Sequence, residues 1–284
     1  MKTELKRPLG VFLQGGGSLG AWQAAALEVL HARGLSFESV MGYSIGAVNG
    51  SAVAFGRLSE ALERWRRLDG GVMRLSPRLW PISLFSVDPL RAFFDHAVDE
   101  DAAKINLKAE FTIVTSCPAE GASVNARFTP GGHEHWDGPL VEHAAASCAI
   151  PFVFPPVDLH HRGRRKRLVD GGVPMPIPID FEPLSKCSDI LVLEMVRADE
   201  LGLRWRTPWR AIDQRARMAS RALVDEGLQP LLRSGRHRVF RLSPSRRLEP
   251  MMLDFRTSGL SIMMAQGAAD AESFLADPAL FRFH

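Results

Sequence analysis

The feature that most constrains this chain is a Gly-Tyr-Ser-Ile-Gly turn centred on Ser44. The apolar residues 37–41 before it predict a short buried strand, and the small residues 47–55 after it predict a buried helix. A Gly-x-Ser-x-Gly turn between a strand and a helix is typical of a nucleophile elbow, whose central serine has a strained backbone. Gly42 and Gly46 would allow the strand and the helix to pass closely. We therefore expect the Ser44 hydroxyl at a helix N-terminus, where developing negative charge is favoured.

A second glycine-rich turn lies upstream, where residues 9–13 predict a strand and residues 21–33 predict a helix. Glycines in such a turn let backbone N–H groups approach an anion closely. One interpretation of this turn is an oxyanion hole. The other is a phosphate-binding loop, because Gly15-x-Gly17-x-x-Gly20 also matches the dinucleotide fingerprint, with Glu38 as a loosely placed acid.

The rest of the chain alternates predicted strands with predicted helices and contains no internal repeat or linker. This alternation indicates a layered α/β sheet, which we expect to form a single domain over residues 1–284. Two apolar stretches contain prolines: residues 72–87 are a candidate lid or acyl-chain wall, and residues 145–157 are a candidate rigid wall. The other predicted strands are 110–116, 123–128, 157–161, 167–169, 189–196 and 236–242, and the other predicted helices are 59–68, 89–98, 139–147, 208–228 and 258–275.

Asp170 ends one of these predicted strands and is followed by Gly171 and Gly172. An acid at the carboxyl end of a strand stands where α/β proteins place active-site groups. An aspartate before glycine is also a common turn former, so this pattern alone leaves both interpretations open.

The composition excludes several classes of protein. The chain has 35 Lys and Arg against 32 Asp and Glu, a net charge of +3, which is too small an excess for a nucleic-acid-binding protein. Its three cysteines have no disulfide or zinc spacing, which fits a reducing compartment and no metal site. No stretch approaches the ~20 apolar residues of a membrane span. We expect a cytoplasmic protein, with peripheral contact at the inner membrane face as an option, and we predict no oligomeric state.

Two basic segments are interpreted mainly as solvated surface. Residues 162–166 read Arg-Gly-Arg-Arg-Lys and predict a solvated hairpin tip, with contact to anionic headgroups as the alternative. Residues 197–250 contain thirteen arginines against six acids and are expected to form a solvated positive face rather than a ligand site.

Four motifs in one order make the chain resemble the patatin-like phospholipase family, in its bacterial form. They are Gly15-Gly16-Gly17-Ser18-Leu19-Gly20, Gly42-Tyr43-Ser44-Ile45-Gly46, the proline-rich segment 147–156, and Asp170-Gly171-Gly172. The resemblance covers about residues 8–270. It implies a three-layer α/β/α sandwich with a central, mostly parallel sheet. It also implies hydrolysis of lipid acyl esters of the phospholipase A, lysophospholipase or lipid esterase type.

The resemblance also implies roles for individual residues. Ser44 is then the nucleophile, Asp170 is the general base of a Ser–Asp dyad, and Gly15, Gly16 and Gly17 form the oxyanion hole. Such an enzyme needs no cofactor and no metal. The chain has Gln14 before the glycine loop, where relatives often carry serine, aspartate or another polar residue.

Two alternatives come from other classes of protein. Ser44, Asp170 and His237 occur in the chain order of a Ser–His–Asp α/β-hydrolase. A non-catalytic nucleotide- or lipid-binding module would use the glycine loop and leave the serine turn unexplained. His143 and His160 are expected to be structural or solvated. A carboxylate base further predicts activity below pH ~6.5, where a free histidine protonates.

Four bulky residues near the motifs are candidates for the border of an acyl-chain groove. This expectation rests only on their apolar character and their proximity in sequence. They are Trp80, Phe85, Phe152 and Phe154.

Overall fold

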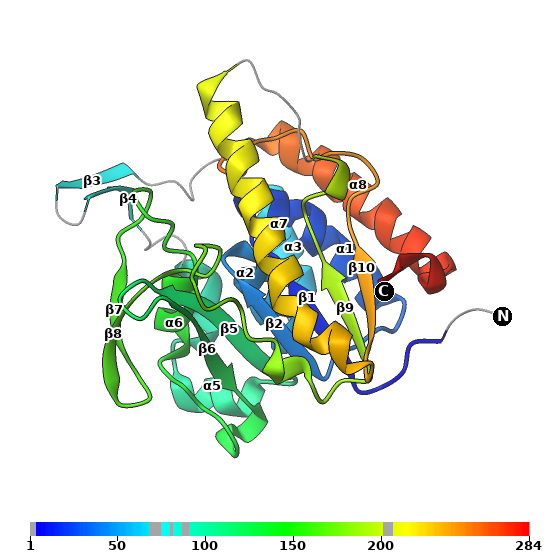
Figure 1. The fold of residues 1–284 in the computed structure, drawn as a ribbon, viewed down its shortest axis with the longest axis horizontal. Coiled ribbons are helices and arrows are strands. Elements are labelled where there is room, and N and C mark those ends of the chain that lie inside the picture. The colour runs from blue at the N-terminus through cyan, green and yellow to red at the C-terminus, as the bar shows by residue number, and fades with distance from the viewer. Residues whose placement is uncertain (1–3, 69–74, 80–81, 87–90, 201–206, 284) are drawn as a thin grey trace.

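The computed structural model describes residues 4–68, 75–79, 82–86, 91–200 and 207–283. Their largest element is a nine-stranded mixed sheet in the order β11-β10-β9-β1-β2-β5-β8-β7, with β6 also paired to β5 (Figure 1). Its strands are β1 (Leu9–Leu13), β2 (Ser39–Tyr43), β5 (Glu110–Cys117), β6 (Ala122–Phe128), β7 (Val157–His161), β8 (Arg164–Asp170), β9 (Asp189–Leu193), β10 (Arg238–Leu242) and β11 (Arg282–Phe283).

The centre of this sheet is parallel, and both of its ends are antiparallel. Strands β10, β9, β1, β2 and β5 run in one direction. Strands β11, β6 and β8 pair antiparallel to their neighbours. The carboxyl ends of the five parallel strands therefore share one edge, which is where an open α/β sheet binds its ligand.

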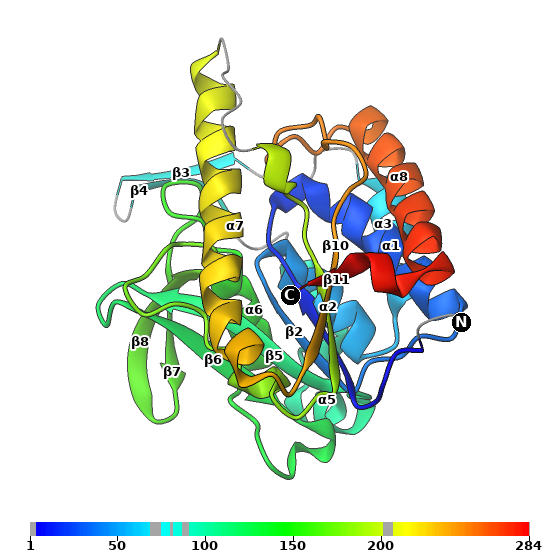
Figure 2. The same ribbon diagram turned by 45° about the vertical axis from the view of Figure 1, so that its right-hand side comes forward.

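Helices cover both faces of the sheet, as Figures 1 and 2 show. Alternate residues of each buried strand point to opposite faces, so Val11 and Leu13 join one apolar core while Phe12 joins the other. The first core includes α1, α2, α3 and α8, and the second includes α7. The helices are α1 (Gly20–Ala32), α2 (Ile45–Ala54), α3 (Leu58–Arg67), α5 (Glu100–Asn106), α6 (Leu140–Ser147), α7 (Pro208–Ser234) and α8 (Thr257–Ala276). The three-layer α/β/α architecture is thus confirmed.

The expectation of a solvated positive face over residues 197–250 holds only for some of its arginines, such as the exposed Arg233 and Arg246, and is wrong for others. Arg217 of α7 is fully buried, with Nε 2.8 Å from Asp213 Oδ2 and Nη1 3.5 Å from Glu200 Oε2. Arg221 and Arg241 both pair with buried Glu194, at 2.8 and 3.2 Å. A buried charge is tolerated only when it is paired, so these arginines attach α7 to the sheet and its loops.

Several predicted elements differ from the observed ones. β8 begins at Arg164, so the basic hairpin tip is shorter than residues 162–166. Residues 75–85 include a separate two-stranded hairpin, β3 (Leu75–Leu79) with β4 (Ile82–Phe85), which we did not predict. Part of the predicted helix 89–98, and part of the candidate lid 72–87, lie outside the described residues.

The β3–β4 hairpin packs on the proline-rich wall. The N–H of Phe85 donates to the carbonyl of Val153 at 2.9 Å, and Ser83 bridges to Phe152. The wall is therefore an irregular segment with its own backbone pairing, as its prolines predict.

Candidate active site

The turn at Ser44 has the backbone geometry of an elbow. Ser44 follows β2 directly, precedes α2, and has φ 53° and ψ −131°, a conformation that costs energy for a residue with a Cβ. A Cβ added at Gly42 would lie 2.7 Å from the carbonyl oxygen of Gly46, and one added at Gly46 would lie 2.1 Å from that of Leu13. Both positions therefore require glycine, because strand and helix pass within contact of each other.

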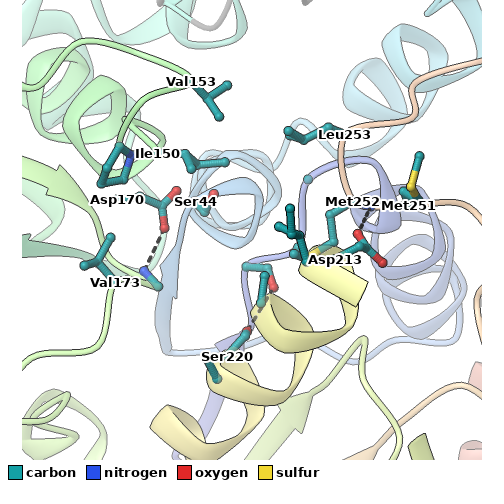
Figure 3. A pocket seen from close by; sticks show the side chains of 18 of the residues that line it. Ser44, Ile150, Val153, Asp170, Val173, Asp213, Ser220, Met251, Met252 and Leu253 are labelled. Atoms are coloured by element: carbon teal, nitrogen blue, oxygen red, sulfur yellow. Dashed lines mark hydrogen bonds between the residues drawn. The ribbon is translucent and has the colours of Figure 1, made fainter. Parts of the chain in front are cut away.

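The register of the sheet brings Asp170 beside this elbow. On one side of β5, Tyr43 pairs with Val114, and the next residue of β5, Thr115, pairs with Asp170. β2 therefore pairs with β5 up to Val114, and β8 pairs with the same side of β5 from Thr115 onward, just beyond the turn at Ser44. Figure 3 shows the two side chains next to each other at one wall of a pocket.

Ser147, the last residue of α6, connects the Ser44 turn to β5. Its Oγ donates to the carbonyl of Val114 at 2.6 Å and accepts from the backbone N–H of Ser44 at 2.9 Å. The carbonyl of Ala149 accepts from the N–H of Asp170 at 3.0 Å. Sequence reasoning included Ser147 in the wall motif but gave it no role.

The Asp170 carboxyl is buried and only half satisfied. Its Oδ1 accepts from the N–H of Gly172 at 2.7 Å, while its Oδ2 has no hydrogen-bond partner within the described chain. Burial raises the pKa of Asp170 to about 6, against the opposing effects of the Ser44 hydroxyl and the Gly172 N–H, which favour the carboxylate. A carboxyl with such a pKa is half-ionised near pH 6, so it can accept and return a proton around neutrality.

The glycine loop faces the same pocket. Gly15, Gly16 and Gly17 line it together with Ser44. Within the described residues, the N–H groups of Gly16 and Gly17 have no hydrogen-bond partner, so both remain available to an anion. Gly15 lies against Tyr43, since a Cβ there would meet the ring at 2.5 Å.

A loop from the C-terminal part of the chain supports the glycine loop. The N–H of Ser18 donates to the carbonyl of Met252 at 2.7 Å, and the Ser18 Oγ donates to that of Met251 at 2.9 Å. A Cβ at Gly17 would lie 2.0 Å from the Met252 oxygen, so this contact requires glycine. In turn, the N–H of Met252 donates to Asp213 Oδ1 at 2.7 Å. Sequence reasoning missed this support because the segments are more than 190 residues apart.

The histidines of the triad alternative lie elsewhere. His237 precedes β10, at the edge of the sheet opposite Ser44, and its Nδ1 contacts the carbonyl of Cys187 at 2.8 Å. His143 is buried, with Nε2 3.1 Å from His161 Nδ1, so it is structural as expected, and His160 is exposed. No histidine among the described residues lines the pocket. The structure therefore does not support a Ser–His–Asp triad.

The dinucleotide-binding alternative lacks an acidic residue in the position that its fingerprint requires. Glu38 precedes β2, on the edge away from the glycine loop, where its Oε2 accepts from the N–H of Leu9 at 2.7 Å. The acid of that fingerprint must lie on the ligand's side of the sheet. The space beside Gly17 is moreover filled by the carbonyl of Met252.

The pocket has a volume of about 690 Å³ and is mainly apolar. Four residues were expected to border an acyl-chain groove, and one of them, Phe152, lines the pocket. Phe154 is buried in the core against Phe85, and these two residues do not line the pocket. Trp80 lies outside the described residues. The opposite wall comes from α7, through Trp209, Ile212, Ala216, Ala219 and Ser220. The helical spacing of these residues was a signal that our sequence analysis did not use.

Comparison with known proteins decides the family. A family model described as "Patatin-like phospholipase" matches residues 11–181, which is more than half of the 284 residues. The chain belongs to the patatin-like phospholipase family. The matched region contains the glycine loop, the Ser44 elbow and Asp170, whereas α7 and the loop of Met251 and Met252 lie beyond it.

The individual proteins that this chain is similar to are distant from it. "Uncharacterized protein YqhO" of Bacillus subtilis (strain 168) is 25% identical over 192 residues, which are 60% of this chain and 65% of that protein, so the chain spans less than two thirds of its length. The crystal structure of VipD from Legionella pneumophila aligns with 96% of this chain and 69% of its own, at 12% identity and a TM-score of 0.41. The crystal structure of the type III effector protein ExoU aligns with 96% of this chain and 53% of the ExoU chain, at 11% identity and a TM-score of 0.42. At this level of similarity they say nothing about chemistry.

Proposed function

We propose that the chain is a serine acyl hydrolase that cleaves carboxylic esters of lipids through a Ser44–Asp170 dyad. Asp170 takes the proton of the Ser44 hydroxyl while Oγ attacks the ester carbonyl carbon. The N–H groups of Gly16 and Gly17 stabilise the negative charge on the carbonyl oxygen, and one such donor contributes on the order of 3 kcal/mol. Collapse of the tetrahedral intermediate releases the alcohol, which takes the proton from Asp170.

The acyl-enzyme is then hydrolysed by the reverse sequence of proton transfers. Water attacks the acyl carbon, Asp170 accepts a proton from that water, and the proton returns to Ser44 Oγ as the carboxylic acid leaves. The observation that carries this proposal is the buried Asp170 carboxyl beside the strained Ser44 (Figure 3). No other described side chain or backbone group is bonded to its Oδ2, and the nearby Ser44 hydroxyl favours the carboxylate. No step uses a metal or a cofactor, and one domain comprising the whole sheet provides every group.

The shape and exposure of the pocket support a lipid substrate. Its walls are mainly apolar, with Asp213 and Ser220 as polar residues of the α7 wall. Its lining includes four exposed apolar side chains: Phe152 (72%), Trp209 (73%), Ile212 (56%) and Leu253 (42%). Large apolar side chains gathered around a pocket mouth favour contact with a lipid surface. Among the described residues no helix is both long and apolar enough to span a bilayer. We therefore propose peripheral contact with a membrane through these exposed side chains.

A covalent label tests the proposed nucleophile. A p-nitrophenyl alkylphosphonate should inactivate the protein with one adduct per chain, which peptide mass spectrometry should locate on Ser44. The Ser44→Ala variant should keep its circular dichroism spectrum and take up no label. An adduct on a different serine would contradict the proposal.

A further inference from the structure

Tyr43, the only tyrosine of the chain, lies at the centre of the catalytic edge, although the mechanism proposed above gives it no role. It ends β2, directly before Ser44, and its buried side chain lines the pocket. A Cβ added at Gly15 would lie 2.5 Å from its Cε2, and one added at Gly172 would lie 2.9 Å from the same atom. One edge of the ring therefore contacts both the glycine loop and the turn that follows Asp170.

The hydroxyl of Tyr43 is bonded to a side chain of α7. Tyr43 Oη lies 2.6 Å from Ser220 Oγ, and Ser220 Oγ lies 3.5 Å from the carbonyl oxygen of Gly15 (Figure 3). A serine hydroxyl has one proton, and a carbonyl can only accept, so Ser220 donates to Gly15 and Tyr43 donates to Ser220. Burial raises the pKa of Tyr43, against the opposing effects of the Ser220 hydroxyl and the Gly15 backbone, so the phenol keeps the proton that this bond needs.

The Gly15 carbonyl belongs to the same peptide unit as the N–H of Gly16. This unit is trans and planar, so its C=O and N–H point in opposite directions and can only turn together. A donor on the carbonyl therefore fixes the direction of the N–H. Within the described residues, Ser220 is the one donor to the Gly15 carbonyl. The bond is long at 3.5 Å, as hydrogen bonds of an active site without substrate often are.

We propose that Tyr43 and Ser220 are positioning residues of the oxyanion hole, a role that rests on the function proposed above. The hydrogen bonds from Tyr43 through Ser220 hold the Gly15–Gly16 peptide, so that the Gly16 N–H points to the carbonyl oxygen of the ester. Neither side chain exchanges a proton with the substrate. The contact of Ser18 with the Met252 carbonyl holds the other end of the loop.

Kinetics on a short p-nitrophenyl ester test this role. Tyr43→Phe and Ser220→Ala each remove one hydroxyl. Each should lower kcat about tenfold and change KM by less than about twofold, because the Gly16 N–H is needed most in the transition state. Residues that act through one chain of bonds are not independent, so the double variant should lose no more than about twofold beyond the more impaired single variant.

The matched control is Ser51→Ala. Ser51 is also buried, and its hydroxyl lies 3.0 Å from His96 Nε2, outside the pocket. This variant should change kcat by less than about twofold. Losses in Tyr43→Phe and Ser220→Ala no larger than that of Ser51→Ala would overturn the proposal. Losses that multiply in the double variant would overturn it too.

A measurement without turnover tests the contact itself. Because the chain has a single tyrosine, incorporation of 3-fluorotyrosine places one ¹⁹F label, at Tyr43. Ser220→Ala should shift its resonance and Ser51→Ala should not, whereas an unshifted resonance in Ser220→Ala would contradict the contact.

The same experiments separate this inference from the function on which it rests. A parent protein that neither hydrolyses the ester nor takes up the phosphonate at Ser44 would contradict the proposed function, and this inference with it. An active parent protein with unaffected Tyr43 and Ser220 variants would contradict the positioning role alone.

Discussion

The N–H of Ser18 donates to the carbonyl oxygen of Met252 at 2.7 Å, which joins the candidate oxyanion loop to a segment outside the region matched by the family model. Asp213 continues this contact, because it accepts from the N–H of Met252 at 2.7 Å and from Arg217 Nε at 2.8 Å. The glycine loop is therefore positioned by side chains of α7, the helix that also forms one wall of the pocket lined by Ser44 and Asp170.

Removing this support should impair turnover more than binding. Asp213→Asn keeps an acceptor for the Met252 N–H but weakens the charged pair with Arg217. We expect kcat for a short p-nitrophenyl ester to fall about tenfold, a fraction of the effect of a lost oxyanion donor, while KM changes little. Asp254→Asn is a control, because Asp254 pairs with the exposed Arg256. Equal effects of the two variants would contradict the positioning role.

Ser147 should contribute to both stability and activity. Ser147→Ala removes one donor from the Val114 carbonyl and the side-chain acceptor of the Ser44 N–H, both of which are buried. The free energy of unfolding should fall by ~1–3 kcal/mol in urea denaturation. Ser123 offers a matched control, since its buried Oγ has no partner in the described chain, and Ser123→Ala should cost less than about 0.5 kcal/mol. Equal losses of unfolding free energy in the two variants would show that the hydrogen bonds of Ser147 contribute nothing to stability.

Phe152 and Phe154 should separate substrate selection from packing. Phe152 lines the pocket and is exposed, so Phe152→Ala should change the preference between butyryl and longer esters with little loss of stability. Phe154 is buried against Phe85, so Phe154→Ala should cost ~3–5 kcal/mol of unfolding free energy and leave chain-length preference unchanged. A parallel change in preference for both variants would mean that Phe152 is not a pocket residue in solution.

The buried carboxyl should make Asp170→Asn more stable than the parent protein. Burial raises the pKa of Asp170 from 3.8 to about 6, so at pH 8 the native state carries a poorly solvated charge that the unfolded chain does not. The asparagine removes this cost, which corresponds to ~3 kcal/mol. The gain should shrink as the pH falls below about 6 and vanish below 3.8, where the parent carboxyl is protonated in both the native and the unfolded state. Urea denaturation at several pH values measures it, and a variant that is less stable at pH 8 would contradict the raised pKa.

From the sequence, the two candidate catalytic residues can be picked out, whereas their surroundings cannot. A short local motif contains each of Ser44 and Asp170, and the register along β5 brings the two motifs together. Met252 and the pocket-lining face of α7 carry no such motif, since their roles depend on contacts between segments far apart in the chain. Arg221 and Arg241 were misjudged as solvated for a similar reason, because their partner Glu194 lies outside the segment 197–250.

The pH profile alone will not identify the base. The proposed base must be ionised, so kcat/KM should rise with pH through about 6, the raised pKa of Asp170. The midpoint of this rise is close to ~6.5, the pKa of a free histidine. Activity below that pH therefore distinguishes only weakly between a carboxylate base and a histidine base. His237→Ala should leave the limb in place.

The most direct test of the dyad compares Asp170→Asn with His237→Ala on one p-nitrophenyl ester at pH 8. Asp170→Asn keeps the shape of the side chain and removes the proton acceptor, so kcat/KM should fall by roughly three to four orders of magnitude. His237→Ala should retain most activity, because His237 lies at the opposite edge of the sheet and contacts the Cys187 carbonyl. Activity preserved in Asp170→Asn, together with its loss in His237→Ala, would contradict the Ser44–Asp170 mechanism.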